Sequence, residues 1–213
     1  MTTSTEQQSD GYTFMVVAHR AMVRDLQQIG DAARALATRP APQQAQALRE
    51  YATKVLALIE HHHEGEDESL WPMLTARGAS PEAIALLTTE HDGLAGQVAE
   101  VQRLLAVARD DGSGFADLAD ATVQLRESLL VHTRDEEREL AGRLRPVLGE
   151  KEWKTFQRAM VKSAPRWTLA FMPPWLASAA EPGERGAMPA PPVAWLMRGR
   201  LRRQRQAAFG EAA

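Results

Sequence analysis

The chain has 213 residues, of which 44% are hydrophobic, 25% charged and 6% aromatic, and its formal net charge is −3. This composition is that of a soluble globular protein and excludes disordered, collagen-like and low-complexity chains. The small negative charge gives no reason to expect nucleic-acid binding. Because the sequence contains no cysteine, disulfides, thiolate nucleophiles, iron–sulfur clusters and cysteine-type zinc sites are excluded, and any metal must be held by histidine or carboxylate.

The N-terminal residues are polar and show neither the basic nor the apolar region of a signal peptide. No run of 18 apolar residues is present, so the sequence predicts no membrane span. We therefore expect a cytoplasmic protein whose residues 1–11 are disordered. Arginine greatly outnumbers lysine and alanine is abundant, which favours a bacterial source with a GC-rich genome.

Four long segments show the spacing of buried helices, with apolar residues in alternating steps of three and four. The third begins with Ser80 as the expected N-cap and Pro81 at the first helical position. Because this period recurs in four segments joined by short turns, it predicts an all-α fold, an antiparallel up-down four-helix bundle over residues 12–148. The segments cover about 12–38, 43–76, 81 onward and 114–145, with Pro- or Gly-containing turns at 40–42, 78–81, 111–114 and 146–149.

The sequence changes character after the bundle, and we expect a helical, Pro- and Trp-rich C-terminal extension over residues 149–213. A short helix is predicted at 150–162 and an arginine-rich helix at 193–209, with a Pro- and Gly-rich stretch between them. From Lys162 onward there are eight basic and three acidic residues, which gives this part a charge of about +5.

The aromatic residues of the extension are costly to leave in water, so we expect them to pack on the exterior or end of the bundle. The basic helix 193–209 is expected to lie against the acidic bundle; the alternative is that it binds an anionic membrane surface or a protein partner. The aromatic residues concerned are Trp153, Phe156, Trp167, Phe171 and Trp175.

Four of the six histidines lie on apolar seams, one in each predicted helix. A lone histidine on an apolar face is usually an ordinary core residue, but one from every helix of a bundle is not expected by chance. Each lies 18 to 21 residues from the turn that joins its helix to its partner, so at about 1.5 Å per residue the two histidines of each hairpin reach nearly the same height. They are His19, His62, His91 and His132.

Two glutamates on the same seams, Glu66 and Glu136, each follow a histidine by four residues, which stacks both side chains on one helical face. Buried carboxylates need a compensating cation, and the seams offer no arginine. Two divalent metal ions bridged by the carboxylates would satisfy all six residues together. A ferritin-like site is disfavoured by the order His-x-x-x-Glu, and a structural zinc site by the number of ligands.

The order of these residues resembles the hemerythrin-like HHE cation-binding family, over about 12–148. The resemblance implies an antiparallel four-helix bundle that holds two iron ions in an oxo- or hydroxo-bridged diiron centre. It implies that His19 and His62 bind one iron and His91 and His132 the other, with Glu66 and Glu136 as bridges. The matching blocks are His19, His62-His63-Glu64-Gly65-Glu66-Asp67 with Leu70-Trp71-Pro72, Glu90-His91, and His132-x-x-x-Glu136-Glu137.

The sequence departs from the oxygen carriers of that family at Ala95, where they have a second ligand histidine one turn after the position of His91. We expect His63 to supply the missing ligand; the alternatives are that His63 only supports a ligand or that the site is open. Asp67, four residues after His63, either orients it or lies at the surface. His61 is expected to be solvated.

These features predict a non-haem diiron protein that binds O₂ or a related small ligand, such as peroxide or nitric oxide, in handling or sensing oxidative or nitrosative stress. Ligand binding is preferred to catalysis because the sequence shows no polar substrate cleft and no phosphate-binding glycine loop. A peroxide- or NO-consuming enzymatic activity is the second possibility. The alternative function is an iron- or oxygen-responsive regulatory protein that signals through its C-terminal extension.

Overall fold

The computed structural model describes residues 10–144 and 148–210, and over these residues all regular structure is helical. Of the N-terminal segment predicted to be disordered, Gly11 is already helical, while residues 1–9 lie outside the described part, as does the predicted turn at Pro146. The elements are α1 (Asp10–Thr38), α2 (Pro42–Gly65), η1 (Glu66–Leu70), α3 (Trp71–Ala76), α4 (Pro81–Val107), α5 (Phe115–Glu139), η2 (Leu140–Leu144), α6 (Glu150–Ser163), α7 (Thr168–Ala179), η4 (Arg185–Ala187) and α8 (Pro191–Phe209).

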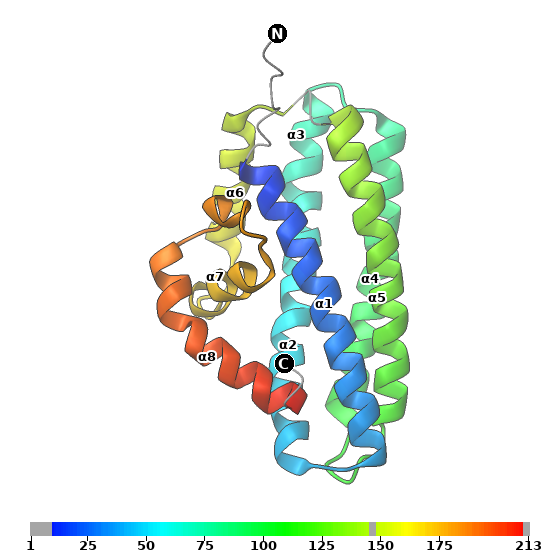
Figure 1. Ribbon diagram of the computed structural model, residues 1–213. Helices are drawn as coiled ribbons and strands as arrows, with labels where there is room; N and C mark the ends of the chain where they lie inside the picture. Colours follow the sequence, from blue (N-terminus) through cyan, green and yellow to red (C-terminus); the bar gives the residue numbers. More distant parts are fainter. Residues whose placement is uncertain (1–9, 145–147, 211–213) are drawn as a thin grey trace.

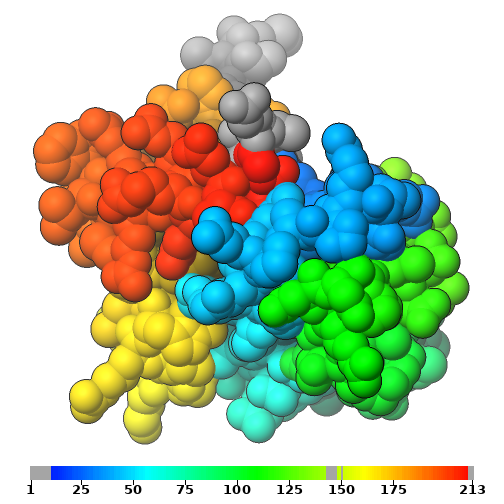
Figure 2. Space-filling view, turned by 90° about the horizontal axis from the view of Figure 1, so that it is seen from below, coloured from blue at the N-terminus to red at the C-terminus, as the bar shows by residue number. Residues whose placement is uncertain are grey.

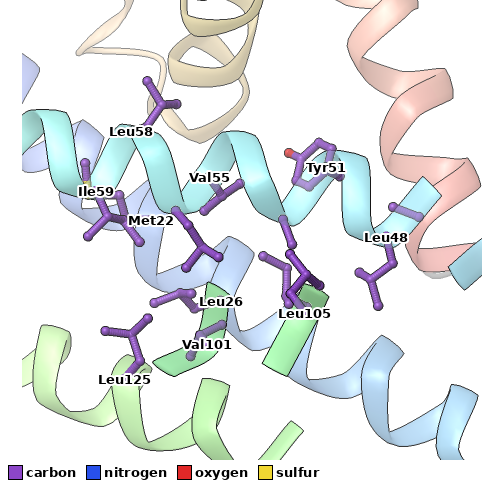
Figure 3. Close-up of a cluster of buried hydrophobic side chains, with 14 of the residues drawn as sticks. Met22, Leu26, Leu48, Tyr51, Val55, Leu58, Ile59, Val101, Leu105 and Leu125 are labelled. Atoms are coloured by element: carbon purple, nitrogen blue, oxygen red, sulfur yellow. The ribbon is translucent and has the colours of Figure 1, made fainter. Parts of the chain in front are cut away.

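The four long helices α1, α2, α4 and α5 lie side by side (Figure 1), with α1 packed along α5, α5 along α4, and α2 against α1 and α4. Helix α4 begins as predicted, because the Ser80 side chain accepts a hydrogen bond from the Ala83 backbone N–H. Between these helices the apolar seams form a dry core (Figure 3). Its residues include Met22, Leu26, Leu48, Val55, Ile59, Val101, Leu105 and Leu125.

The second predicted helix is not continuous. Pro72 is not the cause, because the irregularity starts six residues earlier, at Glu66. There the α-helical hydrogen bonding gives way to the π-helical turn η1, and Pro72 lies in the first turn of α3, where its missing N–H costs little. Helix α5 likewise continues into a π-helical turn, η2. Such turns occur often at functional sites because they shift the register of the side chains that follow.

The segment 148–210, called the C-terminal extension from here on, packs along α1 and α2, on the side away from α4 and α5 (Figures 1 and 2). The expected packing of its aromatic residues is confirmed, since Trp153, Phe156, Phe171 and Trp175 are 1–5% exposed and Trp167 is half-buried. No described helix is both long and apolar enough to span a bilayer.

Helix α7 was not predicted, because Pro173 and Pro174 lie inside it and proline normally disrupts a helix interior. Both prolines are buried, so tertiary packing overrides their low helix propensity. Helix α8, close to the predicted one, contacts α2 and α7. Since Trp195 and Leu196 are 64% and 70% exposed, binding of a membrane surface or partner through residues 193–209 stays a prediction.

The extension is joined to α1 and α2 by a buried carboxylate, Asp25, which is 0% exposed. Its two oxygens accept hydrogen bonds from the Tyr51 hydroxyl at 2.6 Å, the Trp175 indole at 2.8 Å and the Arg205 guanidinium at 2.7 Å. Arg24 of α1 donates a fourth, at 2.8 Å. This Asp25 network therefore links α1, α2, α7 and α8 through one side chain.

Candidate metal centre

All seven residues that the sequence predicts as metal ligands come together in the space between the four long helices. They are 0–6% exposed. Helix α1 contributes one, the C-terminal end of α2 two, the first residue of η1 one, α4 one and α5 two. This group, called the His/Glu cluster below, consists of His19, His62, His63, Glu66, His91, His132 and Glu136.

Four of the five cluster histidines lie in two pairs, and in each pair the two Nε2 atoms face each other at close distance. The Nε2 atoms of His19 and His62 are 2.9 Å apart, and those of His91 and His132 are 3.2 Å apart. Each pair joins two helices that the sequence predicts to form one hairpin, which agrees with the heights expected from the turn spacing. Two ring nitrogens that face each other can form a hydrogen bond only if one of them carries the proton.

The two glutamates each lie between one histidine of each pair. The Oε1 of Glu66 is 3.1 Å from His62 Nε2, and its Oε2 is 3.6 Å from His91 Nε2. The Oε2 of Glu136 is 3.2 Å from His19 Nε2 and 3.5 Å from His132 Nε2. Among the described residues, none of the four carboxylate oxygens has a hydrogen-bond partner, which is rare for buried polar atoms.

Two overlapping sets of potential ligands result, and in each set the ligand atoms lie within 4.8 Å of one another. Glu66 belongs to both sets. The Nε2 of His63 is buried without a partner, so this side chain belongs to the cluster and offers a free ligand atom. The residues present therefore fit two adjacent cations. The sets are His19, His62, Glu66 and Glu136, and His63, Glu66, His91 and His132.

In three of the cluster histidines Nε2 faces the cluster, and the other ring nitrogen, Nδ1, donates a hydrogen bond to a carboxylate. Such a bond fixes the ring orientation and leaves the Nε2 lone pair directed into the cluster. Sequence reasoning gave Glu90 and Glu137 no role, although each is adjacent in sequence to a cluster residue. The contacts are His19 with Glu137 at 3.0 Å, His91 with Asp67 at 2.9 Å and His132 with Glu90 at 2.9 Å.

Two expectations about neighbouring residues, those for Asp67 as a partner of His63 and for His61, were wrong. Asp67 contacts His91 of α4 and not His63, because η1 changes the side-chain register directly after α2. His61 is half-buried, with its Nε2 at 3.0 Å from the Ser163 hydroxyl of α6, so it is not simply solvated. Ala95 is exposed, so a histidine at this position would start from the outer face of α4.

Burial controls the electrostatics of the cluster. It raises the pKa of Glu66 well above the ordinary value, with Glu136 adding to the effect, and it lowers the pKa of His62 and His63. Burial also lowers the pKa of His19, but Glu136 and Glu137 outweigh it and raise that pKa to about 9. Burial raises the pKa of Glu136, yet His19 outweighs it and lowers that pKa to about 2. His19 and Glu136 can therefore form an ion pair, whereas Glu66 lacks a cation.

Comparison with known proteins gives one match. Residues 10–144 match the family model described as hemerythrin HHE cation-binding domain. This range includes every residue of the His/Glu cluster and ends before the C-terminal extension. No curated protein and no solved structure matches the chain.

Proposed function

The chain belongs to the hemerythrin HHE cation-binding domain family, and on that premise we propose that its four long helices form the antiparallel up-down bundle of a diiron protein. In this proposal the His/Glu cluster holds two iron ions and binds O₂ or a related small ligand, such as peroxide or nitric oxide. The role would be the handling or sensing of oxidative or nitrosative stress.

The observation that carries the proposal is the state of Glu66 and Glu136, whose four buried oxygens have no hydrogen-bond partner. A buried carboxylate without compensation is strongly destabilising. Glu136 has only the partial compensation of His19 at 3.2 Å and Glu66 has none, so a shared pair of cations would compensate both. His19 and His62 would hold one iron, and His63, His91 and His132 the other, with Glu66, which belongs to both sets, between them. Glu136 belongs to the first set only, but its Oε2 also lies 3.5 Å from His132 Nε2, so it would lie between the ions as well.

The surrounding carboxylates prepare the histidines for this role. Glu137, Asp67 and Glu90 each accept a hydrogen bond from a histidine Nδ1, so the rings are oriented before a metal arrives. Partners of this kind fix the tautomer and make the inward nitrogen a better ligand.

Apolar side chains would keep bulk water from the cluster. The Trp71 ring stacks on His91 at a centroid distance of 5.8 Å, and Met22, Leu94 and Leu129 are 0–2% exposed. An apolar wall favours a small, weakly polar ligand over a charged one. Bound iron would supply the change between ferrous and ferric states on which the binding of O₂, peroxide or nitric oxide depends.

Metal analysis of the full chain tests the proposal. Protein purified under iron-replete conditions should contain two irons per chain and show the absorption bands of a bridged diiron pair. Glu66→Ala and Glu136→Ala should each lose most of the iron, whereas Glu64→Ala, at an exposed position of α2, should keep it. Zinc alone, or no metal after reconstitution with iron, would contradict the proposal.

The role of His63 has its own test. Because its Nε2 is buried and unpartnered, His63→Ala should weaken the binding of one iron while the other stays. Iron content measured during titration with a chelator should then fall in two separate steps. If the variant keeps both irons with an unchanged spectrum, His63 is not a ligand.

A regulatory function is the second candidate, and one observation favours it. The extension touches the residues next to two cluster histidines, since Arg20 pairs with Glu184 at 2.7 Å and His61 contacts Ser163. Removal of iron should then increase proteolysis or hydrogen exchange in α7 and α8. Equal exchange with and without iron would exclude signalling through the extension.

A further inference from the structure

A cavity of about 350 Å³ lies between the long helices α1 and α2 and the extension helices α6 and α7. Its inner wall includes Met15, Met22 and Trp175, which are 1–2% exposed. Figure 3 shows Leu58, another wall residue, pointing from α2 away from the core and toward the extension. Val161 on α6 also lines the cavity and is 59% exposed. The cavity therefore opens beside α6 and reaches deep between the long helices and the extension.

The cavity ends at the His/Glu cluster. His62 lines it, and the Nε2 of the same ring lies 2.9 Å from His19 Nε2 and 3.1 Å from Glu66 Oε1. Only the imidazole ring of His62 would thus lie between a molecule in the cavity and the other residues of the His/Glu cluster.

The lining chemistry selects the class of molecule. Among the described residues, the lining includes no aspartate, glutamate, lysine or arginine, and its titratable side chains are His61 and His62. Four methionines contribute, and this side chain adapts to differently shaped apolar partners. The volume lies in the usual range for small-molecule pockets, about 300–1,000 Å³. A charged ligand would find no counter-ion here, whereas an uncharged apolar one would meet matching surface. The four methionines are Met15, Met22, Met160 and Met172.

The outer wall of the cavity is held in place by close contacts. A Cβ atom at Gly65 would lie 2.0 Å from the Met160 sulfur, so the Met160 side chain of α6 packs directly against the α2 backbone at this glycine. On α7, Trp175 is fixed by its hydrogen bond to Asp25. These two contacts position both extension helices that line the cavity, so the pocket is preformed.

We propose that this cavity is a binding site for an uncharged, apolar organic molecule that rests against His62. The cavity itself does not depend on the proposed iron centre; only the inference that the bound molecule adjoins two irons rests on the proposed function. The C-terminal extension, which lies outside the matched range 10–144, would thus form a second binding site beside the proposed iron centre. The molecule bound there would be additional to the diatomic gas or peroxide bound at the centre itself.

The test uses N-phenyl-1-naphthylamine, an uncharged probe that becomes fluorescent when it leaves water, with the full chain. We expect saturable binding of one probe per chain. Met172→Trp fills the cavity from α7 and should weaken binding at least tenfold. Leu169→Trp is the matched control, because it adds the same ring to the same helix at a residue that is 62% exposed, and it should change the affinity less than twofold.

Ala187→Trp provides a second variant, since this residue lines the cavity outside the long helices and is half-buried. It should weaken probe binding as Met172→Trp does. Circular dichroism of each variant establishes that the fold is kept. Absence of saturable binding, or equal affinities for the folded Met172→Trp, Ala187→Trp and Leu169→Trp variants, would overturn the proposal.

The metal content separates this inference from the proposed function. Iron loading should quench the bound probe, because ferric centres absorb at its emission wavelengths, whereas zinc loading should not. Probe binding by a chain that takes up no iron would leave the cavity proposal standing and contradict the iron centre. Iron binding without probe binding would support the iron centre and contradict the cavity proposal.

Discussion

Asp25 and Glu66 are two carboxylates with the same exposure, 0%, in opposite chemical surroundings. Asp25 accepts hydrogen bonds from four side chains, two of them arginines. Among the described residues Glu66 has no hydrogen-bond donor within bonding geometry, and its two oxygens lie 3.1 and 3.6 Å from histidine nitrogens. Burial alone therefore says little about the role of a carboxylate; the donors around it decide.

The difference indicates a structural role for the Asp25 network and agrees with the binding role proposed for the His/Glu cluster. A buried charge with arginine and hydrogen-bond donors is compensated by the protein itself, so it stabilises only the arrangement that supplies those donors. A buried carboxylate that faces ring nitrogens is compensated when a cation enters. The two regions should accordingly respond in opposite directions when their carboxylates are removed.

The largest effect is expected for Asp25→Ala. It leaves the buried groups of Arg205, Trp175 and Tyr51 without their acceptor, which typically costs about 3–5 kcal/mol. Urea unfolding followed by circular dichroism measures the loss. Asp31→Ala, at an exposed position of the same helix, should cost little. A loss below about 1 kcal/mol for Asp25→Ala would show that the network does not hold the extension.

Glu66→Met should raise the free energy of unfolding of the metal-free chain, whereas Asp25→Ala should lower it. It replaces an uncompensated buried carboxyl by an apolar side chain of similar size, so we expect a gain of about 2 kcal/mol. The measurement is urea unfolding in the presence of a chelator, with Glu64→Met at an exposed position as the control. A loss as large as that of Asp25→Ala would remove the distinction between the two regions.

Glu90→Gln tests whether a carboxylate that accepts a hydrogen bond from a cluster histidine increases the metal affinity of the cluster. The Glu90 carboxylate accepts from His132 Nδ1 at 2.9 Å, and loss of such a partner typically lowers metal affinity by about 10- to 100-fold. Competition with a coloured chelator gives the affinity. Glu127→Gln, at an exposed position of α5, should leave it unchanged. Equal affinities in the two variants would mean that the carboxylate does not support the ligand.

The smallest effect is expected for Tyr51→Phe. It removes the 2.6 Å hydrogen bond to Asp25 and the 3.0 Å bond that the hydroxyl accepts from Arg205, but Asp25 keeps its bonds from Arg24, Trp175 and Arg205. The expected cost is about 1–2 kcal/mol, since one such bond is ordinarily worth about 0.5–1.5 kcal/mol. Urea unfolding again measures it. A cost equal to that of Asp25→Ala would show that one donor, rather than the whole set, compensates the carboxylate.

Much of the four long helices could be predicted because their signals are local. The apolar period and the cap at Ser80 need only neighbouring residues, and the separation of each cluster histidine from its turn gives its height on the helix. Glu66 and Glu136 stood out because a carboxylate on an apolar seam conflicts with its surroundings. That conflict is visible in the sequence without any tertiary information.

The remaining features depend on distant residues. Arg24 and Asp25 look like an exposed pair of opposite charges, and only α7 and α8, 150 and 180 residues later, bury the aspartate. Helix α7 was missed because local propensity argues against Pro173 and Pro174, and burial of both prolines outweighs it. The partner of Asp67 depended on η1, whose change of register has no clear sequence signal.

The long sequence separation within the Asp25 network has a consequence for synthesis. Asp25 and Arg205 are 180 residues apart, so at about 5–20 residues per second a ribosome adds the arginine roughly 10–40 s after the aspartate. The four long helices, which end at Glu139, are synthesised within that interval and before α8, so until then the Asp25 carboxylate lacks the Arg205 guanidinium. Helix α8 therefore docks late, onto a surface of α1 and α2 that is exposed to solvent until the end of synthesis.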